Sequence, residues 1–553
     1  MAGSQGWTVV KINCTVLWGI LHRKPATGGP GRGLQSVKKK TGLGGFLALS
    51  VEMQSLLLKT VLAMLCVDGS TKFQSTKQFR GFKANVKNIP PLILTNMSVL
   101  KSIRKRIASR DDTLAHAAAL LKIDAEDAMT AQSWTEGAGP WSVMNQSAIA
   151  PSHNRHDYFS TAKYCWPCNT ICNATIENIT GNDCKAWKSG SDYHPQKCNN
   201  STGLPWLCHD GYANPINDHL GRGLWDSLYY TVPTLALSAF MTDNATQARR
   251  AALLTRTWFV EESSRMNPNL EFAQAIPGIN NGTGGGIIDF SDHHKLLDIL
   301  DAMTMLQASS DTHVSQTWSE SDAEALRQWV IDFKVWLNAS HHAHQEQGSS
   351  NNHGTWFDVM ASGLAVYTKD TQGVRQLCDS FLRDRLAVQV QPAGASVEHG
   401  GPNAGALPME DSRTNSQSYH SMDADGLLIL AQLCAQTPNA PDVIHTSTPC
   451  FDWKKRSKHK WYSPCKDNSS LRVTLADVPD WAAPYAANVT AWPFRQITSY
   501  EYPYYWAHVF RRAANLFHNA TYERIVQGLP DGGVAPKYIL DLIEPYVGPD
   551  IGV

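Results

Sequence analysis

The stretch FDVMASGLAVYTKDTQGVRQLCDSFL, residues 357–382, contains two apolar runs separated by a short polar turn. Apolar side chains recur in both runs at intervals of three and four residues: Phe357, Met360, Leu364 and Tyr367, then Val374, Leu377, Phe381 and Leu382. This spacing places them on one face of a helix. The turn between the runs, TKDT at residues 368–371, offers helix-capping side chains. The stretch therefore predicts two antiparallel helices joined as a hairpin.

Similar patterns lie upstream. Residues 326–337 carry a stripe of apolar side chains at helical spacing: Leu326, Trp329, Phe333, Trp336 and Leu337. Residues 224–241 and 251–260 flank the polar turn 242–246 and predict another hairpin. Successive hairpins without alternating strand patterns indicate an all-α ring or solenoid of helical hairpins, and they argue against a parallel α/β sheet. Periodicity alone does not choose between ring and solenoid.

Two long segments interrupt this helical pattern. Residues 145–222 are rich in Cys, Gly and aromatic side chains, and residues 436–500 are rich in Pro and Trp. Both have little helical signal, and we expect long loops there. A last amphipathic helix is predicted near residues 506–517. No clear linker separates these parts, so we expect one domain over residues 90–553.

The N-terminal region, residues 1–75, is predicted to be an extension outside that domain. It contains a basic, Gly-rich stretch and then MQSLLLKTVLAMLCV at residues 53–67. This apolar run is too short to span a membrane but has the length of a signal-peptide core. Lys59 interrupts it. We interpret the segment as either a signal peptide starting at Met53 or part of a long signal-anchor, and we expect no other membrane contact.

Asn-X-Ser/Thr sequons are far denser than the chance rate of roughly one per hundred residues. Beyond residue 53 they begin at Asn96, Asn145, Asn173, Asn178, Asn199, Asn200, Asn244, Asn281, Asn338, Asn468, Asn488 and Asn519. Polar loops rich in Asn, Ser and Thr are the plainer explanation. The density favours a secreted, extracellular protein that carries N-linked glycans and is either free or associated with a cell wall.

Cysteine usage also favours an oxidising compartment. Six of the 12 cysteines crowd residues 165–208, and Cys450 and Cys465 bracket a second polar segment. Such clusters are typical of disulfides that staple long loops, although their pairing does not follow from sequence. A zinc knuckle on Cys165 and Cys168 is the alternative. Cys378 and Cys434 lie in apolar helical patterns, and we expect them to be buried thiols.

The charge balance excludes electrostatic attraction of a polyanion by the net charge of the chain. Lys plus Arg and Asp plus Glu are equal, at 49 each, so the formal net charge is zero. No overall field draws the chain to nucleic acid or to an anionic polymer. Nucleic acid is therefore not an expected partner, and binding of a polyanion requires a local cluster of basic side chains.

The first motif with chemical potential is NNHGTW, residues 351–356, directly before an amphipathic helix. Backbone N–H groups at a helix start favour an anion, and Asn352 and His353 can both donate hydrogen bonds to a carboxylate. A plain helix cap explains the same residues equally well.

The second motif is EDSRTNSQSYH, residues 410–420. Arg413 supplies a permanent cation with a planar fork, and Tyr419 supplies a phenol of ordinary pKa about 10. We expect the adjacent Arg413 to lower the pKa of Tyr419 by about one to three units. A helix start with a solvated Arg is the alternative.

Several collinear motifs resemble the alginate lyase family. NNHGTWFD at residues 351–358 resembles its Asn-Asn-His segment, and Arg413-Thr414 with Tyr419 resembles its Arg-Thr…Tyr segment. Similar blocks lie upstream: DYFS at 157–160, YCWP at 164–167, GLPW at 203–206, and RMNPNL at 265–270 with Gln274. The resemblance covers roughly residues 155–435 in the right order.

The resemblance implies an (α/α) toroid, or incomplete barrel, with a cleft for an anionic uronate polysaccharide cleaved by β-elimination. Asn352, His353 and Arg413 would neutralise the sugar carboxylate. Tyr419 would act as the acid, and also as the base for syn elimination, whereas His353 is the candidate base for anti elimination. No cofactor or metal is implied. The predicted substrate-binding residues are Tyr158, Tyr164, Trp166, Arg265, Asn267, Asn269, Gln274 and Trp356.

Two other classes of function remain open. A glycoside hydrolase on an α/α barrel would need Glu410 or Asp411 paired with a second acid. A catalytically inactive carbohydrate-binding or cell-wall protein would keep the fold alone. Two weaker features are the histidines of residues 341–344, which more often form a solvated loop than a metal site, and Asp292-His293-His294, which either lines the cleft or starts a helix.

Overall fold

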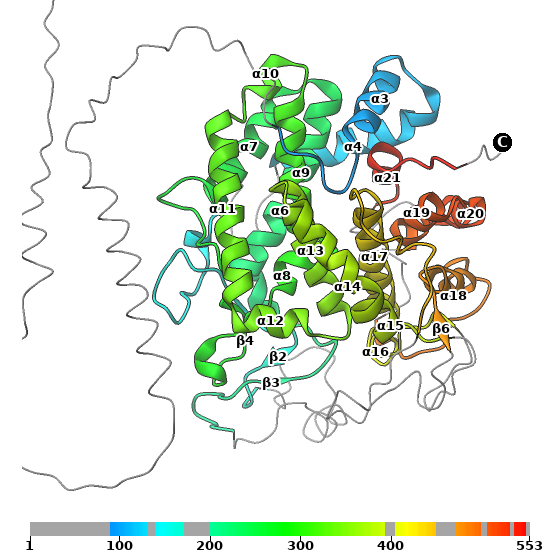
Figure 1. Ribbon diagram of the computed structural model, residues 1–553. Coiled ribbons are helices and arrows are strands. Elements are labelled where there is room, and N and C mark those ends of the chain that lie inside the picture. The colour runs from blue at the N-terminus through cyan, green and yellow to red at the C-terminus, as the bar shows by residue number, and fades with distance from the viewer. Residues whose placement is uncertain are drawn as a thin grey trace, which may run out of the picture. The chain divides into compact units, whose positions relative to one another are not determined.

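In the computed structural model, residues 357–382 fold as the predicted helical hairpin (Figure 1). Helix α13 runs Asn352–Tyr367, and helix α14 runs Thr371–Phe381. Asp370 caps α14 by accepting a hydrogen bond from the backbone N–H of Gly373. The hairpin at residues 224–260 is confirmed as α6 (Gly221–Thr242) and α7 (Ala245–Phe259), with Asn244 as the cap between them.

The structure describes residues 89–130, 139–170, 198–392, 404–449, 471–498, 506–530 and 536–548. All of them belong to one compact unit, residues 88–553. The expected signal or anchor segment lies outside the described residues. Within the described ranges, no helix is both long and apolar enough to cross a bilayer.

Most described residues are helical. Besides the two hairpins, the helices are α3 (Met97–Ala108), α4 (Asp112–Thr130), α8 (Ile288–Ser291), α9 (Lys295–Ala308), α10 (Thr312–Ser315), α11 (Glu320–Ala339), α12 (His341–Gln347), α15 (Ala387–Gln389), α16 (Pro408–Asp411), α17 (Ser416–Ala435), α18 (Asp477–Ala486), α19 (Trp506–Phe517), α20 (Ala520–Gly528) and α21 (Tyr538–Ile543).

The packing of these helices follows a closed circuit. α6 packs against α4, α7 and α9, α13 packs against α9 and α17, and α17 packs against α19. Arg511 of α19 pairs with Asp541 of α21, and α21 packs back against α4. The fold is therefore all-α, as predicted, and its helices succeed one another in the order expected of an (α/α) ring.

The strands are short and pair across the loops. β1 (Phe159–Thr161) runs parallel to β4 (Phe272–Ala275), β2 (Cys165–Trp166) pairs with β3 (Leu207–Cys208), and β5 (Thr448–Pro449) pairs with β6 (Arg472–Val473). β1 and β4 bring residues 160 and 274, far apart in sequence, next to each other. That pairing sets one wall of the cleft described below.

Three local predictions were wrong. The segment 436–500 contains a helix, α18, whose Trp481 and Tyr485 pack into the core. The helix at residues 506–517 is present as α19, but it is not the last, because α20 and α21 follow. The histidines of residues 341–344 form helix α12 instead of a loop, since Ser340 caps its first turn.

The structure confirms two disulfides in the Cys-rich loop and corrects the prediction for Cys378 and Cys434. Cys165 pairs with Cys208, and Cys168 pairs with Cys198, so both cysteines of the zinc-knuckle alternative are held in disulfides. Cys378 and Cys434, predicted to be buried thiols, also form a disulfide. They are buried as expected, but α14 packs against α17 and brings the two sulfurs together. Cys172, Cys184, Cys450 and Cys465 lie outside the described residues.

Removing the Cys378–Cys434 disulfide is expected to lower the free energy of unfolding by about 2–4 kcal/mol, because the bridge closes a long loop in the unfolded chain. The sequence separation of the two cysteines is 56. Denaturant titration of the Cys378→Ser/Cys434→Ser double variant measures the loss. A midpoint equal to that of the wild type would contradict the prediction.

Candidate active site

A cleft of about 770 Å³ opens where the long loop after β1, the start of α13 and the start of α17 meet. It brings together residues as far apart in the sequence as Ala162 and Met422. All four predicted catalytic residues line it: Asn352, His353, Arg413 and Tyr419. Tyr164, Gln274, Asp292 and His293 line it as well.

Arg413 is fixed from one side by Asp210. Its Nε and Nη2 donate to the two carboxylate oxygens at 3.0 and 2.6 Å, and Thr414 donates to the same carboxylate from its backbone and its hydroxyl. Burial raises the pKa of Asp210, but these hydrogen bonds and the Arg413 charge outweigh it and lower the pKa below its ordinary value. Asp210 therefore occupies the edge of the Arg413 guanidinium formed by Nε and Nη2. The third nitrogen, Nη1, lies 3.9 Å from Glu410.

A glycine makes this contact possible. Gly211, next to Asp210, has a φ of +87°, and a Cβ there would lie 2.3 Å from the hydroxyl of Thr414. Any other residue would be strained at that φ and would collide with Thr414. The turn therefore delivers the Asp210 carboxylate to Arg413.

Tyr419 lies between Arg413 and Tyr164. The guanidinium carbon of Arg413 is 3.6 Å from the centre of the Tyr419 ring, and the two phenol oxygens of Tyr419 and Tyr164 are 2.6 Å apart. Burial raises the pKa of Tyr419 well above its ordinary value, and Tyr164 adds to that effect, while the charge of Arg413 opposes it. The expectation of a lowered pKa was therefore wrong, because it considered the cation without the desolvation.

Asn352 is the first residue of α13 and is 1% exposed. Its backbone N–H and its side-chain amide both donate to one oxygen of Glu410, at 2.8 and 2.7 Å. Burial raises the pKa of Glu410 even though Arg413 and Asn352 favour its carboxylate. The buried oxygen of the Asn352 amide accepts no hydrogen bond from the described residues. Glu410 thus sets the orientation of the amide.

His353 follows on the same helical turn and is partly exposed to the cleft. Its Nδ1 lies 2.8 Å from the Glu346 carboxylate of α12. Burial lowers the pKa of His353, but the charge and hydrogen bond of Glu346 outweigh it, and the net pKa is raised. This arrangement favours the imidazolium, and it directs Nε2 away from Glu346.

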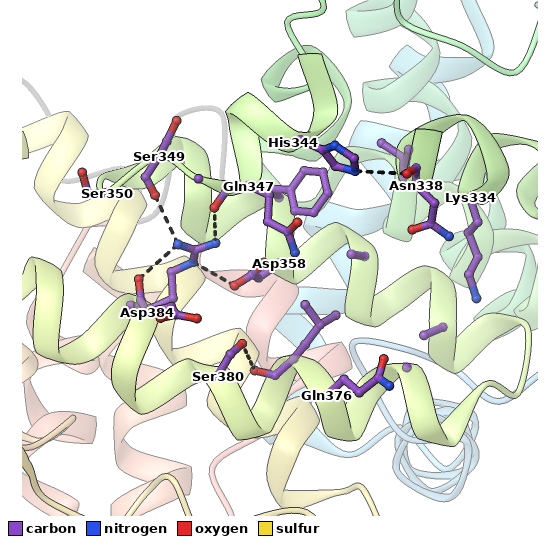
Figure 2. Close-up of a pocket in the computed structure, with 18 of the residues that line it drawn as sticks. Lys334, Asn338, His344, Gln347, Ser349, Ser350, Asp358, Gln376, Ser380 and Asp384 are labelled. Atoms are coloured by element: carbon purple, nitrogen blue, oxygen red, sulfur yellow. Dashed lines mark hydrogen bonds and ion pairs between the residues drawn. The ribbon is translucent and has the colours of Figure 1, made fainter. Parts of the chain in front are cut away.

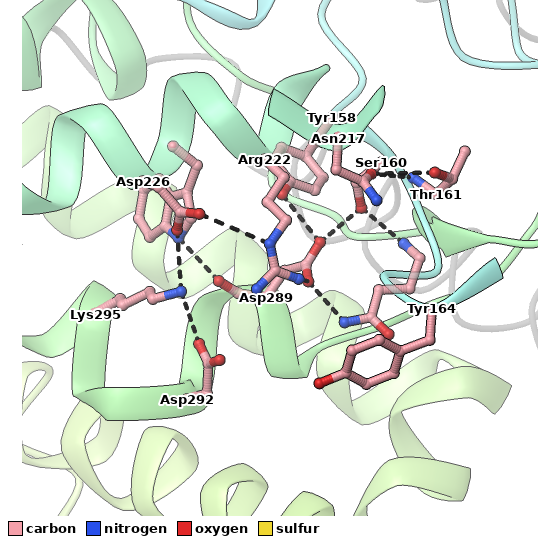
Figure 3. A network of polar contacts seen from close by, with 12 residues as sticks. Tyr158, Ser160, Thr161, Tyr164, Asn217, Arg222, Asp226, Asp289, Asp292 and Lys295 are labelled. Carbon is pink, nitrogen blue, oxygen red and sulfur yellow. Dashed lines mark hydrogen bonds and ion pairs between the residues drawn. The ribbon is translucent and has the colours of Figure 1, made fainter. Parts of the chain in front are cut away.

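Behind the cleft wall, Asp289 of α8 collects a polar network (Figure 3). Its carboxylate accepts hydrogen bonds from the side chains of Tyr158, Ser160, Arg222 and Gln274 at 2.6–3.0 Å. Lys295 adds ion pairs to Asp226 and Asp292, both at 3.0 Å. A charged network this buried is satisfied only when every member is in place, so it fixes the wall geometry.

The predicted substrate-binding residues fall into two groups. Tyr164 and Gln274 line the cleft. Tyr158 and Trp356 are buried, with Tyr158 bonded to Asp289, so neither presents a ring to the cleft. The remaining residues also lie outside its lining: Trp166 donates to the Tyr212 carbonyl, Asn267 and Asn269 donate to Asp157, and Arg265 is exposed elsewhere.

Asp292 and His293 line the cleft, as one of the two interpretations of this motif expected, and they lie in a short 3₁₀ turn directly before α9. Sequence reasoning missed the carboxylates that hold the cleft residues: Asp210, which lines the cleft, and Glu346 and Glu410, which lie behind its lining. The sequence indicated Glu410 only as a possible acid of a hydrolase. Asp210 follows the GLPW block at residues 203–206, but nothing in its spacing indicated a pairing with Arg413. Among the described residues, no cluster of three or more His, Cys, Asp or Glu side chains has metal-binding geometry.

Comparisons with known proteins identify the family and a similar fold. The family model for alginate lyases matches residues 142–449, which is more than half of the 553 residues. The crystal structure of an alginate lyase from Bacteroides ovatus is similar over 82% of this chain and 99% of its own, with a TM-score of 0.63 and 22% identity. A search of curated proteins finds no match.

The all-α fold, the cleft and these matches define a polysaccharide lyase. The chain belongs to the alginate lyase family.

Proposed function

We propose that the chain cleaves a uronic-acid polymer of the alginate or glucuronan type by β-elimination in this cleft. The observation that carries the proposal is the convergence of Asn352, His353, Arg413 and Tyr419 on one cleft from two distant segments. Had the two segments lined separate sites, these side chains would have had no common substrate.

The carboxylate of the sugar needs neutralising because the adjacent carbon is a poor acid. Removing its proton adds negative charge beside an existing charge. One cation at about 4 Å is worth about 4 kcal/mol at an effective dielectric of 20. Arg413 supplies this charge through Nη1, His353 adds a second cation, and Asn352 adds an amide donor.

Proton delivery falls to Tyr419. Burial keeps its phenol protonated at neutral pH, which suits an acid that protonates the leaving glycosidic oxygen. For syn elimination the same oxygen must first lose its proton, and the stacked Arg413 charge favours that phenolate. For anti elimination His353 is the base, and it must then give up the proton that Glu346 favours.

The hydrolase alternative has little support. Glu410 and Asp411 are both buried, with Glu410 bonded to Asn352 and Asp411 bonded to His420, and neither lines the cleft. A glycosidase needs two carboxyl groups that reach the scissile bond from opposite sides. The positions of these two acids therefore favour the lyase.

We also infer that the protein is secreted and N-glycosylated. Disulfides support an oxidising compartment. Most sequon asparagines in the described residues are exposed, as glycan attachment requires: Asn96, Asn145, Asn199, Asn200, Asn244, Asn281, Asn338 and Asn488, with Asn519 half-buried. Asn173, Asn178 and Asn468 lie outside the described residues. Glycopeptide mass spectrometry of the secreted protein tests this inference.

One assay separates the three classes of function. A lyase acting on polymannuronate, polyguluronate or glucuronan produces an unsaturated uronate with new ultraviolet absorbance. A hydrolase produces reducing ends without that absorbance, and a binding protein produces neither. Reducing ends without absorbance on every polymer would overturn the proposal.

A further inference from the structure

The segment between α12 and α13, residues 348–351, joins Glu346 to the cleft residues Asn352 and His353. Glu346 lies in the last turn of α12, and Asn352 and His353 open α13. The N-cap residue of α13, Asn351, makes no side-chain capping hydrogen bond. The start of this helix is therefore not fixed by its own cap, and its position depends on contacts from elsewhere.

Arg385 supplies such contacts to Gln347, Ser349 and Asp358, which are labelled in Figure 2. Its Nη2 donates to the carbonyl of Gln347 at 2.7 Å, and its Nη1 donates to the carbonyl of Ser349 at 3.2 Å. Its Nε donates to Asp358 of α13 at 2.8 Å. One guanidinium therefore ties the end of α12, the connecting segment and the body of α13 to each other.

Arg385 and the groups that it holds, which we call the clamp, are buried and have little conformational freedom. The side chains of Arg385 and Asp358 are 4% and 2% exposed. Arg385 lies in a π-helical turn, Leu382–Leu386, which follows α14 directly. π-Helical turns are rare in proteins, but those that occur are often at functional sites. Here the turn directs the guanidinium towards α12 and α13.

Gly354, the neighbour of His353, completes the arrangement. A Cβ at this position would lie 2.1 Å from the carbonyl oxygen of Ser349 and 2.8 Å from Nη1 of Arg385. The absence of a side chain thus lets the first turn of α13 approach the clamped segment. The clamp therefore contacts the chain at Gly354, one residue after His353.

We propose that Arg385 is a positioning residue, which holds Glu346, Asn352 and His353 in register for the reaction by clamping the segment that joins them. The catalytic part of this inference rests on the proposed function, whereas the geometric part does not. Arg385 touches no cleft surface itself. It acts through the backbone carbonyls of Gln347 and Ser349.

Two variants test the clamp in different ways. Arg385→Lys keeps a cation for Asp358 but loses the fork that reaches two carbonyls. Gly354→Ala keeps both charged side chains but adds a Cβ that would meet the Ser349 carbonyl at 2.1 Å and Nη1 of Arg385 at 2.8 Å. It therefore displaces the connecting segment, and it supplies the measurement if Arg385→Lys does not fold. Arg383→Lys is the matched control, because Arg383 lies in the same turn, is exposed and pairs only with Asp384 among the described residues.

The first readout is the NMR titration of His353, assigned by its loss in His353→Gln. The charged groups that face His353 are Glu346, Glu410 and Arg413. In both test variants we expect the pKa of His353 to fall towards its ordinary value as Glu346 moves away, and we expect no change in Arg383→Lys. This readout needs no substrate, so it stands even if the proposed activity fails.

The second readout is kcat on the best polyuronate, which we expect to fall by about 10–100-fold with a smaller change in KM, because misplacement affects the transition state most. Lower thermal stability with an unchanged His353 titration and unchanged kcat would overturn the proposal, since it would leave Arg385 a purely structural role.

Discussion

Replacing Tyr419 by Phe is expected to lower kcat on a polyuronate by about 10²–10⁴-fold, the usual contribution of a general acid–base group. The variant removes only the hydroxyl, which lies 2.6 Å from the hydroxyl of Tyr164, and it keeps the ring that stacks on Arg413. KM should change little, because binding of the sugar carboxylate does not use the phenol. Initial rates of ultraviolet absorbance measure both constants.

Tyr230→Phe is a matched control, since this phenol is 44% exposed and lies outside the cleft lining. We expect it to keep wild-type rates. Full activity in Tyr419→Phe would show that another group protonates the leaving oxygen.

The pH profile separates the two roles of Tyr419. Its raised pKa means that the phenol keeps its proton through neutral pH. If Tyr419 must lose that proton before it can act as the base, kcat/KM rises as pH increases into the alkaline range. If it acts only as the acid and His353 is the base, kcat/KM rises instead as His353 loses its proton, and it reaches a plateau above the pKa of His353.

The sequence predicted the helical hairpins well because their signal is local. Phe357, Met360 and Leu364 are within two turns of each other, and their spacing alone predicts a helix there, although α13 is buried on nearly every side. The all-α class follows from repeating that pattern. The closing of the helices into a circuit depends on distant contacts, such as Arg511 with Asp541, which no local period encodes.

The motifs predicted the residues that line the cleft but not the carboxylates that hold them. Asn352, His353, Arg413 and Tyr419 belong to motifs, and the structure brings them to one cleft. Their partners are single carboxylates such as Asp210, 203 positions from Arg413, so sequence spacing gives no indication of the pair. Desolvation is likewise a property of the folded cleft, which is why the direction of the Tyr419 pKa shift was missed.

The occupied fork of Arg413 leads to the second large effect. Arg413→Lys keeps a positive charge, yet we expect kcat to fall by about 10²–10³-fold, comparable to the loss of one well-placed donor to a developing oxyanion. Lysine cannot bind both oxygens of Asp210, donate further to the substrate and stack on Tyr419 at once, because it has neither the planar fork nor the reach of guanidinium. The loss should appear in kcat more than in KM.

A second variant distinguishes the effect of the position of the Arg413 guanidinium from the effect of its charge. Asp210→Asn keeps Arg413 intact but removes the carboxylate that holds its Nε and Nη2. If the role of Asp210 is to orient Arg413, this variant also loses kcat, although the net charge of the cleft becomes more positive. If charge alone governs catalysis, Asp210→Asn would bind the polyanion more tightly and cleave it at least as fast as the wild type. A faster Asp210→Asn enzyme together with a fully active Arg413→Lys enzyme would show that the geometry of the guanidinium is not what the reaction requires.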